Sequence, residues 1–230
     1  MDEPALSHTR PRAEATMRPR QLRRGLYLIT PDERDPQRLL ERTLPLLPFA
    51  SCVQLRSKVM GRSALLDMGS RLRIACLEAG TAFIVNDDAG IAHAVGADGV
   101  HLGEQDSAIA DARALLGDDA IIGTSCYDDL ARAHAAAAAG ADYIAFGACF
   151  PSPTKPAARR ASLGLFRHAE PLQLPRVAIG GITPDNASAV IAAGADLVAV
   201  ISGVFDAPDP VAAARAYLSC FEAPHADPHS

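Results

Sequence analysis

The sequence has no tryptophan, and none of its apolar runs is long. A membrane-spanning helix needs about 18 or more consecutive apolar residues, so no membrane span is expected. The arginine-rich start is not followed by an apolar core, which argues against a secretory signal. An excess of positive charge is missing as well, because the formal net charge is -5. Nucleic-acid binding needs a basic patch, so it is not expected here. These absences predict a soluble, cytoplasmic protein that binds neither membrane nor nucleic acid.

The chain also lacks cysteines with the pattern of disulfides or metal ligands. Its five cysteines are odd in number and irregular in spacing: Cys52, Cys76, Cys126, Cys149 and Cys220. Thiols of cytoplasmic proteins stay reduced. We therefore expect mostly buried, free thiols, and none of them is a candidate nucleophile.

The residues that are present suffice for one folded α/β domain, because 49% of the 230 residues are hydrophobic. Residues 1–24 carry six arginines and three prolines without a periodic pattern, which predicts a disordered leader. Met17 is an alternative start of translation. Residues 25–221 form the predicted catalytic domain, and residues 222–230 a flexible tail.

Short apolar runs alternate with helical patterns throughout this domain. The predicted strands are residues 25–30, 51–58, 82–86, 99–102, 120–125, 142–147, 176–181 and 197–202. Strand-helix units of about 20 to 30 residues fit a closed (β/α)8 TIM barrel better than an open, doubly wound sheet. Barrels of this kind carry their chemistry at the C-terminal ends of the strands. Polar residues at those ends are therefore the candidates for a site.

Two neighbouring strands end in carboxylates. Asp87 follows the third predicted strand, and Asp106 lies shortly after the fourth. If a right-handed crossover joins these strands in parallel, both carboxylates lie on one edge of the sheet. Such a pair suits Mg²⁺, which keeps room for phosphate oxygens. Two solvated turn residues are the alternative, because Asp is common in turns.

Lysine is scarce, and its two positions are informative. Among 22 basic residues only Lys58 and Lys155 are lysines, and both follow predicted strands. A compact ammonium at these places can serve where a planar guanidinium cannot. With Arg56 they would face the carboxylate pair, as is needed to hold a diphosphate bridged by a metal. A chance placement of two lysines is the alternative.

Glycines after the last two strands indicate a second anion site. Gly180 and Gly181 follow the seventh strand, and Gly203 follows the eighth. Without a Cβ, these residues let an anion approach the backbone amides, and barrels often bind phosphate there. A tight turn alone would also explain the glycine pair.

Six segments, VQLRSK, FIVNDD, HLGEQD, PSPTKP, IGGIT and VISG, occur in one order between about Gly25 and Phe221. In this order and spacing they resemble the thiamine phosphate synthase family. The resemblance implies a (β/α)8 barrel that joins a hydroxymethylpyrimidine diphosphate to a thiazole phosphate and releases diphosphate with Mg²⁺. A thiazole tautomerase of the same fold and a non-catalytic thiazole-phosphate-binding sensor are the alternatives, and assembly into homo-oligomers stays open.

The resemblance also implies roles for individual residues. Four would hold the diphosphate: Arg56, Lys58, Asn86 and Lys155. Asp87 and Asp106 would hold the Mg²⁺. Three would contact the aminopyrimidine, namely Gln54, Gly103 and Ser125, and five would hold the thiazole phosphate, namely Ser152, Thr154, Gly181, Ile201 and Ser202. Lys155, Arg56, Lys58 and Ser125 are the predicted catalytic residues, and the motifs depart from the family's usual pattern at Ser57 (often Glu) and Ser152 (often Thr).

A mechanism without an obligatory general base fits these residues. Diphosphate can leave first and give a stabilised pyrimidine cation, which the thiazole nitrogen then captures. His101 is then expected to be a packed or hydrogen-bonded strand-end residue and not a catalyst. The loop from Pro151 to Gly164, which carries Lys155, is predicted to be mobile in the empty enzyme and to close over the phosphates.

Overall fold

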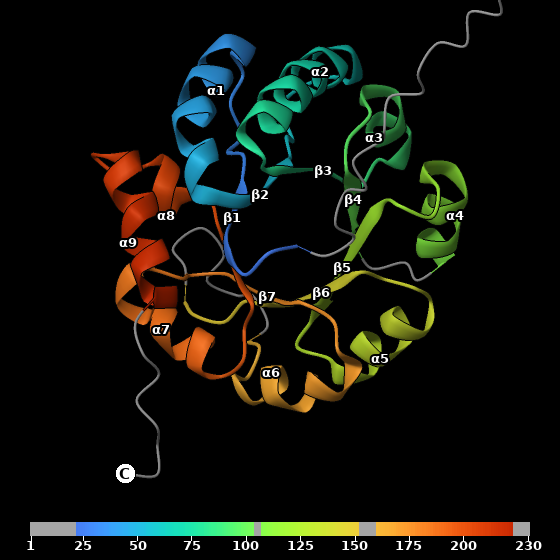
Figure 1. Ribbon diagram of the computed structural model, residues 1–230, viewed down its shortest axis with the longest axis vertical. Coiled ribbons are helices and arrows are strands. Elements are labelled where there is room, and N and C mark those ends of the chain that lie inside the picture. Colours follow the sequence, from blue (N-terminus) through green and yellow to red (C-terminus); the bar gives the residue numbers. More distant parts are fainter. Residues whose placement is uncertain (1–21, 104–106, 152–159, 223–230) are drawn as a thin grey trace, which may run out of the picture.

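The computed structural model describes residues 22–103, 107–151 and 160–222. Its eight strands are parallel and close into a barrel in sequence order, with β8 paired to β1. The helices form a ring around the strands (Figure 1). The predicted (β/α)8 TIM barrel is therefore confirmed.

The elements alternate along the chain as the sequence pattern requires. The strands are β1 Gly25–Ile29, β2 Ala50–Leu55, β3 Ala82–Asn86, β4 Gly99–Leu102, β5 Ile121–Tyr127, β6 Tyr143–Gly147, β7 Arg176–Ile179 and β8 Leu197–Val200. The α-helices are α1 Pro36–Thr43, α2 Arg62–Ala79, α3 Ala89–Val95, α4 Ser107–Leu116, α5 Leu130–Ala138, α6 Gly164–His168, α7 Pro184–Ala192, α8 Ser202–Phe205 and α9 Pro210–Glu222. Two 3₁₀ helices, η1 Leu44–Phe49 and η2 Glu170–Leu172, complete the description. Within the described ranges, no helix is long and apolar enough to cross a membrane.

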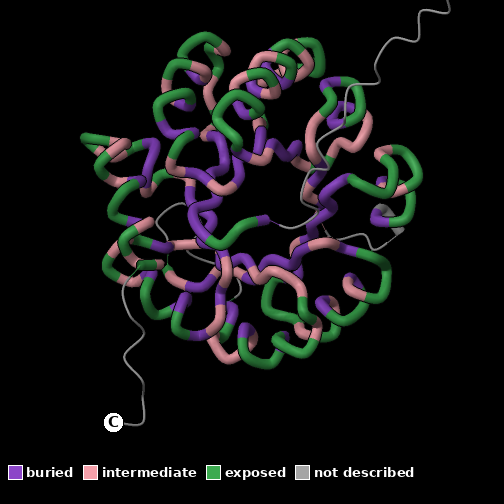
Figure 2. The backbone as a smooth tube through the Cα atoms, viewed as in Figure 1, coloured by how far each residue is buried: buried purple, intermediate pink, exposed green. Residues whose placement is uncertain are grey.

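Alternate residues of each strand face two separate apolar layers. Leu26, Leu28 and Val53 pack in the larger cluster beneath the helices, whereas Tyr27 and Cys52 belong to the smaller cluster inside the barrel. This period of two follows from the pleat of a strand. Figure 2 shows the result, with buried residues on the strands and exposed residues on the outer faces of the helices.

The segment Gly-Ala-Asp recurs before β4, β6 and β8 and builds the same corner each time. Each glycine has a positive φ, which ends the preceding helix: 66° at Gly96, 90° at Gly140 and 107° at Gly194. Each aspartate then binds one residue of the preceding strand through both of that residue's backbone groups. These pairs are Asp98 with Phe83, Asp142 with Ile122, and Asp196 with Arg176.

Arginines reinforce these corners. The Nη2 atom of Arg113 lies 2.6 Å from Oδ2 of Asp142, and Nε of Arg176 lies 3.1 Å from Oδ2 of Asp196. All three corners lie at the N-terminal ends of their strands. They therefore fix the floor of the barrel, away from the ends where chemistry is expected.

The predicted leader and tail fall largely outside the described residues. Positions 1–21 and 223–230 are not described. Leu22, the first described residue, is buried and packs with the cluster inside the barrel. The guanidinium of Arg23 donates to the carbonyl of Gly80 at 2.9 Å.

Candidate active site

The described candidate residues all lie at the C-terminal ends of the strands. Gln54, Asn86 and Ser125 lie among the last residues of β2, β3 and β5. The others follow strand ends within three residues: Arg56, Lys58, Asp87, Gly103, Gly181, Ile201 and Ser202. Because all neighbouring strands are parallel, these ends form one rim. Four predicted site residues lie outside the described residues: Asp106, Ser152, Thr154 and Lys155. The predicted lid, residues 151–164, is likewise described only at its two ends.

The loop after β1 fixes the two cationic residues that follow β2. The hydroxyl of buried Thr30 donates to the carbonyl of Arg56 at 2.8 Å and accepts the Arg56 N–H at 2.9 Å. Asp32 accepts the N–H of Lys58 at 2.7 Å, and its other oxygen lies 3.9 Å from Nη1 of Arg56. Lys58 remains exposed at the rim. Thus one short loop holds the backbone of both cations in place.

Asp87 is held in an uncommon backbone conformation beside the end of β4. Its φ is 61°, and its N–H donates to the carbonyl of His101 at 2.7 Å. The side-chain amide of Asn86 donates to Oδ2 of Asp87 at 2.7 Å. A Cβ placed on Gly103 would lie 3.7 Å from Oδ1 of Asp87, so the carboxylate leans toward the segment that leads to Asp106. Positive φ outside glycine is uncommon and gathers at functional sites.

The donor chemistry of this position fits Mg²⁺. Asp87 is exposed and offers carboxylate oxygens, which are the ligands that Mg²⁺ prefers. Its predicted partner Asp106 is not described, and among the described residues no three His, Cys, Asp or Glu side chains gather as a metal-binding group. The neighbouring Asp88 has another task, because it caps α3 through the N–H of Ile91 at 2.8 Å and pairs with Arg62 at 2.7 Å.

A chain of hydrogen bonds crosses the interior of the barrel just below the rim. Gln54 Nε2 donates to Tyr27 Oη at 3.0 Å, and Tyr27 Oη lies 2.8 Å from Tyr143 Oη. Tyr143 Oη lies 2.9 Å from His101 Nδ1, and His101 Nε2 lies 2.9 Å from Ser125 Oγ. Two predicted pyrimidine contacts, Gln54 and Ser125, are therefore joined through side chains of β1, β4 and β6. His101 is hydrogen-bonded at a strand end, as expected.

Burial keeps this chain uncharged near neutral pH. It lowers the pKa of His101 from 6.5 to about 4. Burial also raises the pKa of Tyr27 and of Tyr143 well above 10.0. A neutral imidazole has one N–H and one acceptor nitrogen, so His101 links a donor on one side to an acceptor on the other.

The glycine loop after β7 is closely packed against the segment after β6. Gly181 has a φ of 65°, and a Cβ there would lie 2.5 Å from the carbonyl oxygens of Phe150 and Pro151. Only glycine fits both constraints. The carbonyl of Gly181 accepts the side-chain amide of Asn186 at 3.1 Å, and Asn186 forms a capping box with Thr183 at the start of α7. The loop predicted to bind phosphate is thus tied to the helix that follows it.

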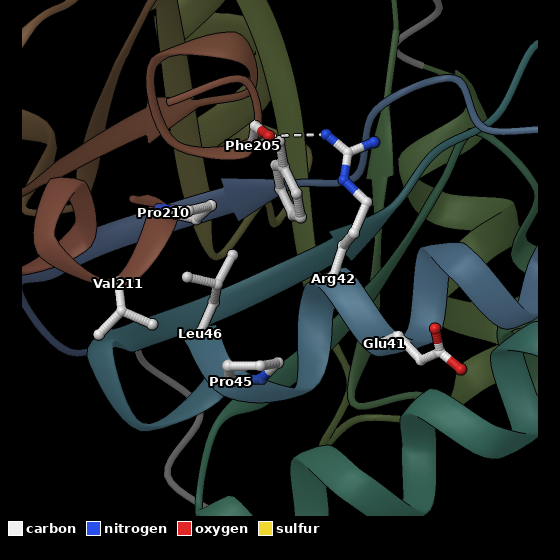
Figure 3. A pocket seen from close by; sticks show the side chains of 7 residues that line it. All are labelled: Glu41, Arg42, Pro45, Leu46, Phe205, Pro210 and Val211. Atoms are coloured by element: carbon white, nitrogen blue, oxygen red, sulfur yellow. Dashed lines mark hydrogen bonds between the residues drawn. The ribbon is translucent and has the colours of Figure 1, made fainter. Parts of the chain in front are cut away.

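A hollow on the flank of the barrel is separate from this rim. It lies between α1, η1, α8 and α9, and Figure 3 shows its lining: Glu41, Arg42, Pro45, Leu46, Phe205, Pro210 and Val211. Arg42 donates to the carbonyl of Phe205 at 2.6 Å and lies over its ring at 5.7 Å. None of the lining residues was a candidate from the sequence. Arg42 here joins α1 to α8, which is a packing role.

Comparisons with known proteins agree with this architecture. The chain matches the family model for thiamine monophosphate synthase over residues 26–204. It is 57% identical over 198 residues to the thiamine-phosphate synthase of Xanthomonas campestris pv. campestris (strain 8004), covering 86% of this chain and 96% of that protein. It is 55% identical over 202 residues to the thiamine-phosphate synthase of Azoarcus sp. (strain BH72), covering 86% and 97%. The solved thiamine phosphate pyrophosphorylase from Pyrococcus furiosus superposes with a TM-score of 0.76 at 36% identity, covering 86% of this chain and 95% of that one.

Proposed function

Because the chain belongs to the thiamine monophosphate synthase family, we propose that its barrel rim joins an aminopyrimidine diphosphate to a thiazole phosphate, forming thiamine phosphate. The observation that carries this proposal is the convergence of four consecutive strands, β2 to β5, on one rim. The residues at their ends are those assigned to the pyrimidine diphosphate, apart from Lys155: Gln54, Arg56, Lys58, Asn86, Gly103 and Ser125. A carboxylate, Asp87, lies in the middle of this arc.

In the proposed reaction, the bond between the pyrimidine methylene carbon and the diphosphate oxygen breaks, and its electron pair leaves with diphosphate. The lone pair of the thiazole nitrogen then forms the new C–N bond. Arg56, Lys58 and Asn86 face the departing anion and stabilise its charge, as preorganised cations and donors do. Gln54 and Ser125 orient the pyrimidine ring.

Mg²⁺, held by Asp87 and Asp106, would neutralise negative charge on the diphosphate oxygens. Lys155, Ser152 and Thr154 would add contacts from the loop after β6. On the far side of the rim, Gly181 with Ile201 and Ser202 would hold the thiazole phosphate through backbone amides and a hydroxyl. The five free thiols are in keeping with a cytoplasmic location.

Release of diphosphate from the two substrates tests this function against its alternatives. The wild-type protein should release one diphosphate per thiamine phosphate formed, and removal of Mg²⁺ by a chelator should stop it. A tautomerase would release none, and a sensor would bind the thiazole phosphate without turnover.

Asp87→Ala should lower turnover by roughly 10²-fold or more, because one ligand of the charge-neutralising metal is lost. The matched control is Asp67→Ala, which removes a carboxylate that is 68% exposed on α2. Equal turnover of the two variants at limiting Mg²⁺ would contradict the metal assignment.

A further inference from the structure

One direction of donation gives every donor of the hydrogen-bond chain inside the barrel an oxygen or nitrogen acceptor. Gln54 presents its amide Nε2, which can only donate, to Tyr27 Oη. Because Tyr27 accepts this hydrogen, its own hydroxyl hydrogen is available for Tyr143 Oη, 2.8 Å away. The hydrogen of Tyr143 then points to Nδ1 of His101 at 2.9 Å. In this arrangement each tyrosine hydroxyl donates its hydrogen bond in the direction of β4.

The His101 imidazole connects the two tyrosines to Ser125 at the rim. A neutral His101 whose Nδ1 accepts must carry its hydrogen on Nε2, and that hydrogen points to Ser125 Oγ at 2.9 Å. Ser125 is therefore an acceptor toward His101, and its own hydroxyl hydrogen remains for another partner. Ser125 is only partly buried and lies on the upper part of β5, where substrate is expected.

The opposite direction fits the structure less well. In that case Tyr27 would accept from both Gln54 and Tyr143. Its own hydrogen would then turn to the thiol of Cys52, which is its remaining interaction partner. Thiol sulfur is a weak acceptor, whereas the first arrangement gives every hydroxyl hydrogen of the two tyrosines an oxygen or nitrogen.

Packing holds the members of the chain in these positions. The Tyr143 ring occupies the space where a Cβ of residue 123 would be, so Gly123 is needed beneath it. The ring stacks on His101 with centroids 5.6 Å apart and meets the Tyr27 ring edge-on at 6.0 Å. Side chains locked in this way are preorganised before substrate arrives.

We propose that Tyr27, Tyr143 and His101 are positioning residues that fix Ser125 as a hydrogen-bond donor toward the substrate. The substrate group opposite Ser125 is then an acceptor, a ring nitrogen of the aminopyrimidine, and not the exocyclic amino group, which donates. This inference rests on the proposed function, since it concerns the pyrimidine of that reaction.

A double-mutant cycle tests the coupling. Tyr143→Phe and Ser125→Ala should each raise the KM for the pyrimidine diphosphate roughly 10-fold, the size of one hydrogen bond, and leave the KM for the thiazole phosphate unchanged. In the Ser125→Ala background, Tyr143→Phe should have no further effect, because there is no hydroxyl left to orient. Thr81→Val, which removes a buried hydroxyl bond to Leu47 away from the rim, is the control and should change neither KM.

Two substitutions of His101 and an analogue make the test independent of any single variant's folding. His101→Gln can place an amide donor near the Nε2 position and should therefore retain most of the affinity for the pyrimidine diphosphate. His101→Asn reaches only the Nδ1 position and should lose that affinity. A pyrimidine diphosphate with the facing ring nitrogen replaced by C–H should bind the wild type roughly 10-fold more weakly and Ser125→Ala without loss.

The outcomes separate the two proposals. Wild-type protein without diphosphate release overturns the proposed function. Normal release, together with additive effects of Tyr143→Phe and Ser125→Ala or equal loss of both substrates, overturns the positioning role alone.

Discussion

Asp142→Ala tests how much one Gly-Ala-Asp corner contributes to stability. The Asp142 carboxylate accepts the N–H of Ile122 at 2.8 Å and a guanidinium hydrogen of Arg113 at 2.6 Å. Its side chain is 16% exposed and that of Arg113 is 21% exposed, so both interactions are partly shielded from water. Removing the carboxylate leaves the Ile122 N–H without its acceptor, which costs about 1–3 kcal/mol.

The lost ion pair adds a smaller amount. Arg113 also donates to the carbonyls of Ala120 and Gly140, so its charge is not left without partners when Asp142 is removed. The pair therefore contributes about 1 kcal/mol, near the exposed limit and well below a fully buried pair. The total expected loss in the free energy of unfolding is about 2–4 kcal/mol. Asp142→Asn keeps an acceptor oxygen and should lose about 1–2 kcal/mol.

Urea unfolding followed by circular dichroism measures these differences as shifts of the midpoint at a constant slope. Asp67→Ala is the reference, because Asp67 pairs with Arg71 on the surface at 3.9 Å and should cost no more than about 0.5 kcal/mol. Turnover of folded Asp142→Ala should equal that of wild type, since the corner lies at the opposite end of the barrel from the rim. A loss no larger than that of Asp67→Ala would refute the reasoning.

Three further outcomes are expected. Gly123→Ala should destabilise the protein by about 1–3 kcal/mol because its methyl group would overlap the Tyr143 ring, whereas Gly61→Ala, with no atom near its Cβ position, should change urea stability by less than about 0.5 kcal/mol. Ser202→Asp should raise the KM for the thiazole phosphate roughly 10-fold, since it sets a negative charge beside the anion, and an unchanged KM would contradict the site. Burial lowers the pKa of His101 from 6.5 to about 4, so below pH 6.5 the unfolded chain binds a proton that the folded chain does not, and stability falls until about pH 4. Between pH 7.5 and 5 the wild type should lose about 2 kcal/mol more than His101→Gln in urea titrations, and parallel losses would exclude His101 as the cause.

The fold could be predicted because strand and helix patterns in this chain are local and strong. The helical spacing of small apolar residues in AGIAHAV, for example, is visible in the sequence, and α3 spans these residues, Ala89–Val95. No individual helix was assigned from the sequence to the residues of α4, SAIADARALL, although the alternation of strands and helices requires one between β4 and β5. The eighth strand was predicted over residues 197–202, but β8 ends at Val200, and Ser202 instead begins the four-residue helix α8.

The candidate site was predictable only in part. Strand-end polar residues and the family motifs indicated Gln54 and Ser125, but nothing in the sequence links them. The link runs through Tyr27 and Tyr143, which are 116 positions apart and look like ordinary apolar strand residues. Asp32 was missed for a similar reason, since its effect on Lys58 depends on how the loop after β1 folds over the end of β2. Such contacts arise from closure of the barrel and leave no local pattern.

The Gly-Ala-Asp corners also bear on the order in which the chain folds. Each corner joins residues only 15 or 20 positions apart, so little chain entropy is lost when it forms. Three βαβ units can therefore form early, each held by its own Gly-Ala-Asp corner: β3–α3–β4, β5–α5–β6 and β7–α7–β8. Pairing of β1 with β8 joins Gly25 to Leu197 and is the contact of longest range, so it belongs to the last, slow step. The barrel then assembles by association of preformed βαβ units, and pairing of β1 with β8 closes it.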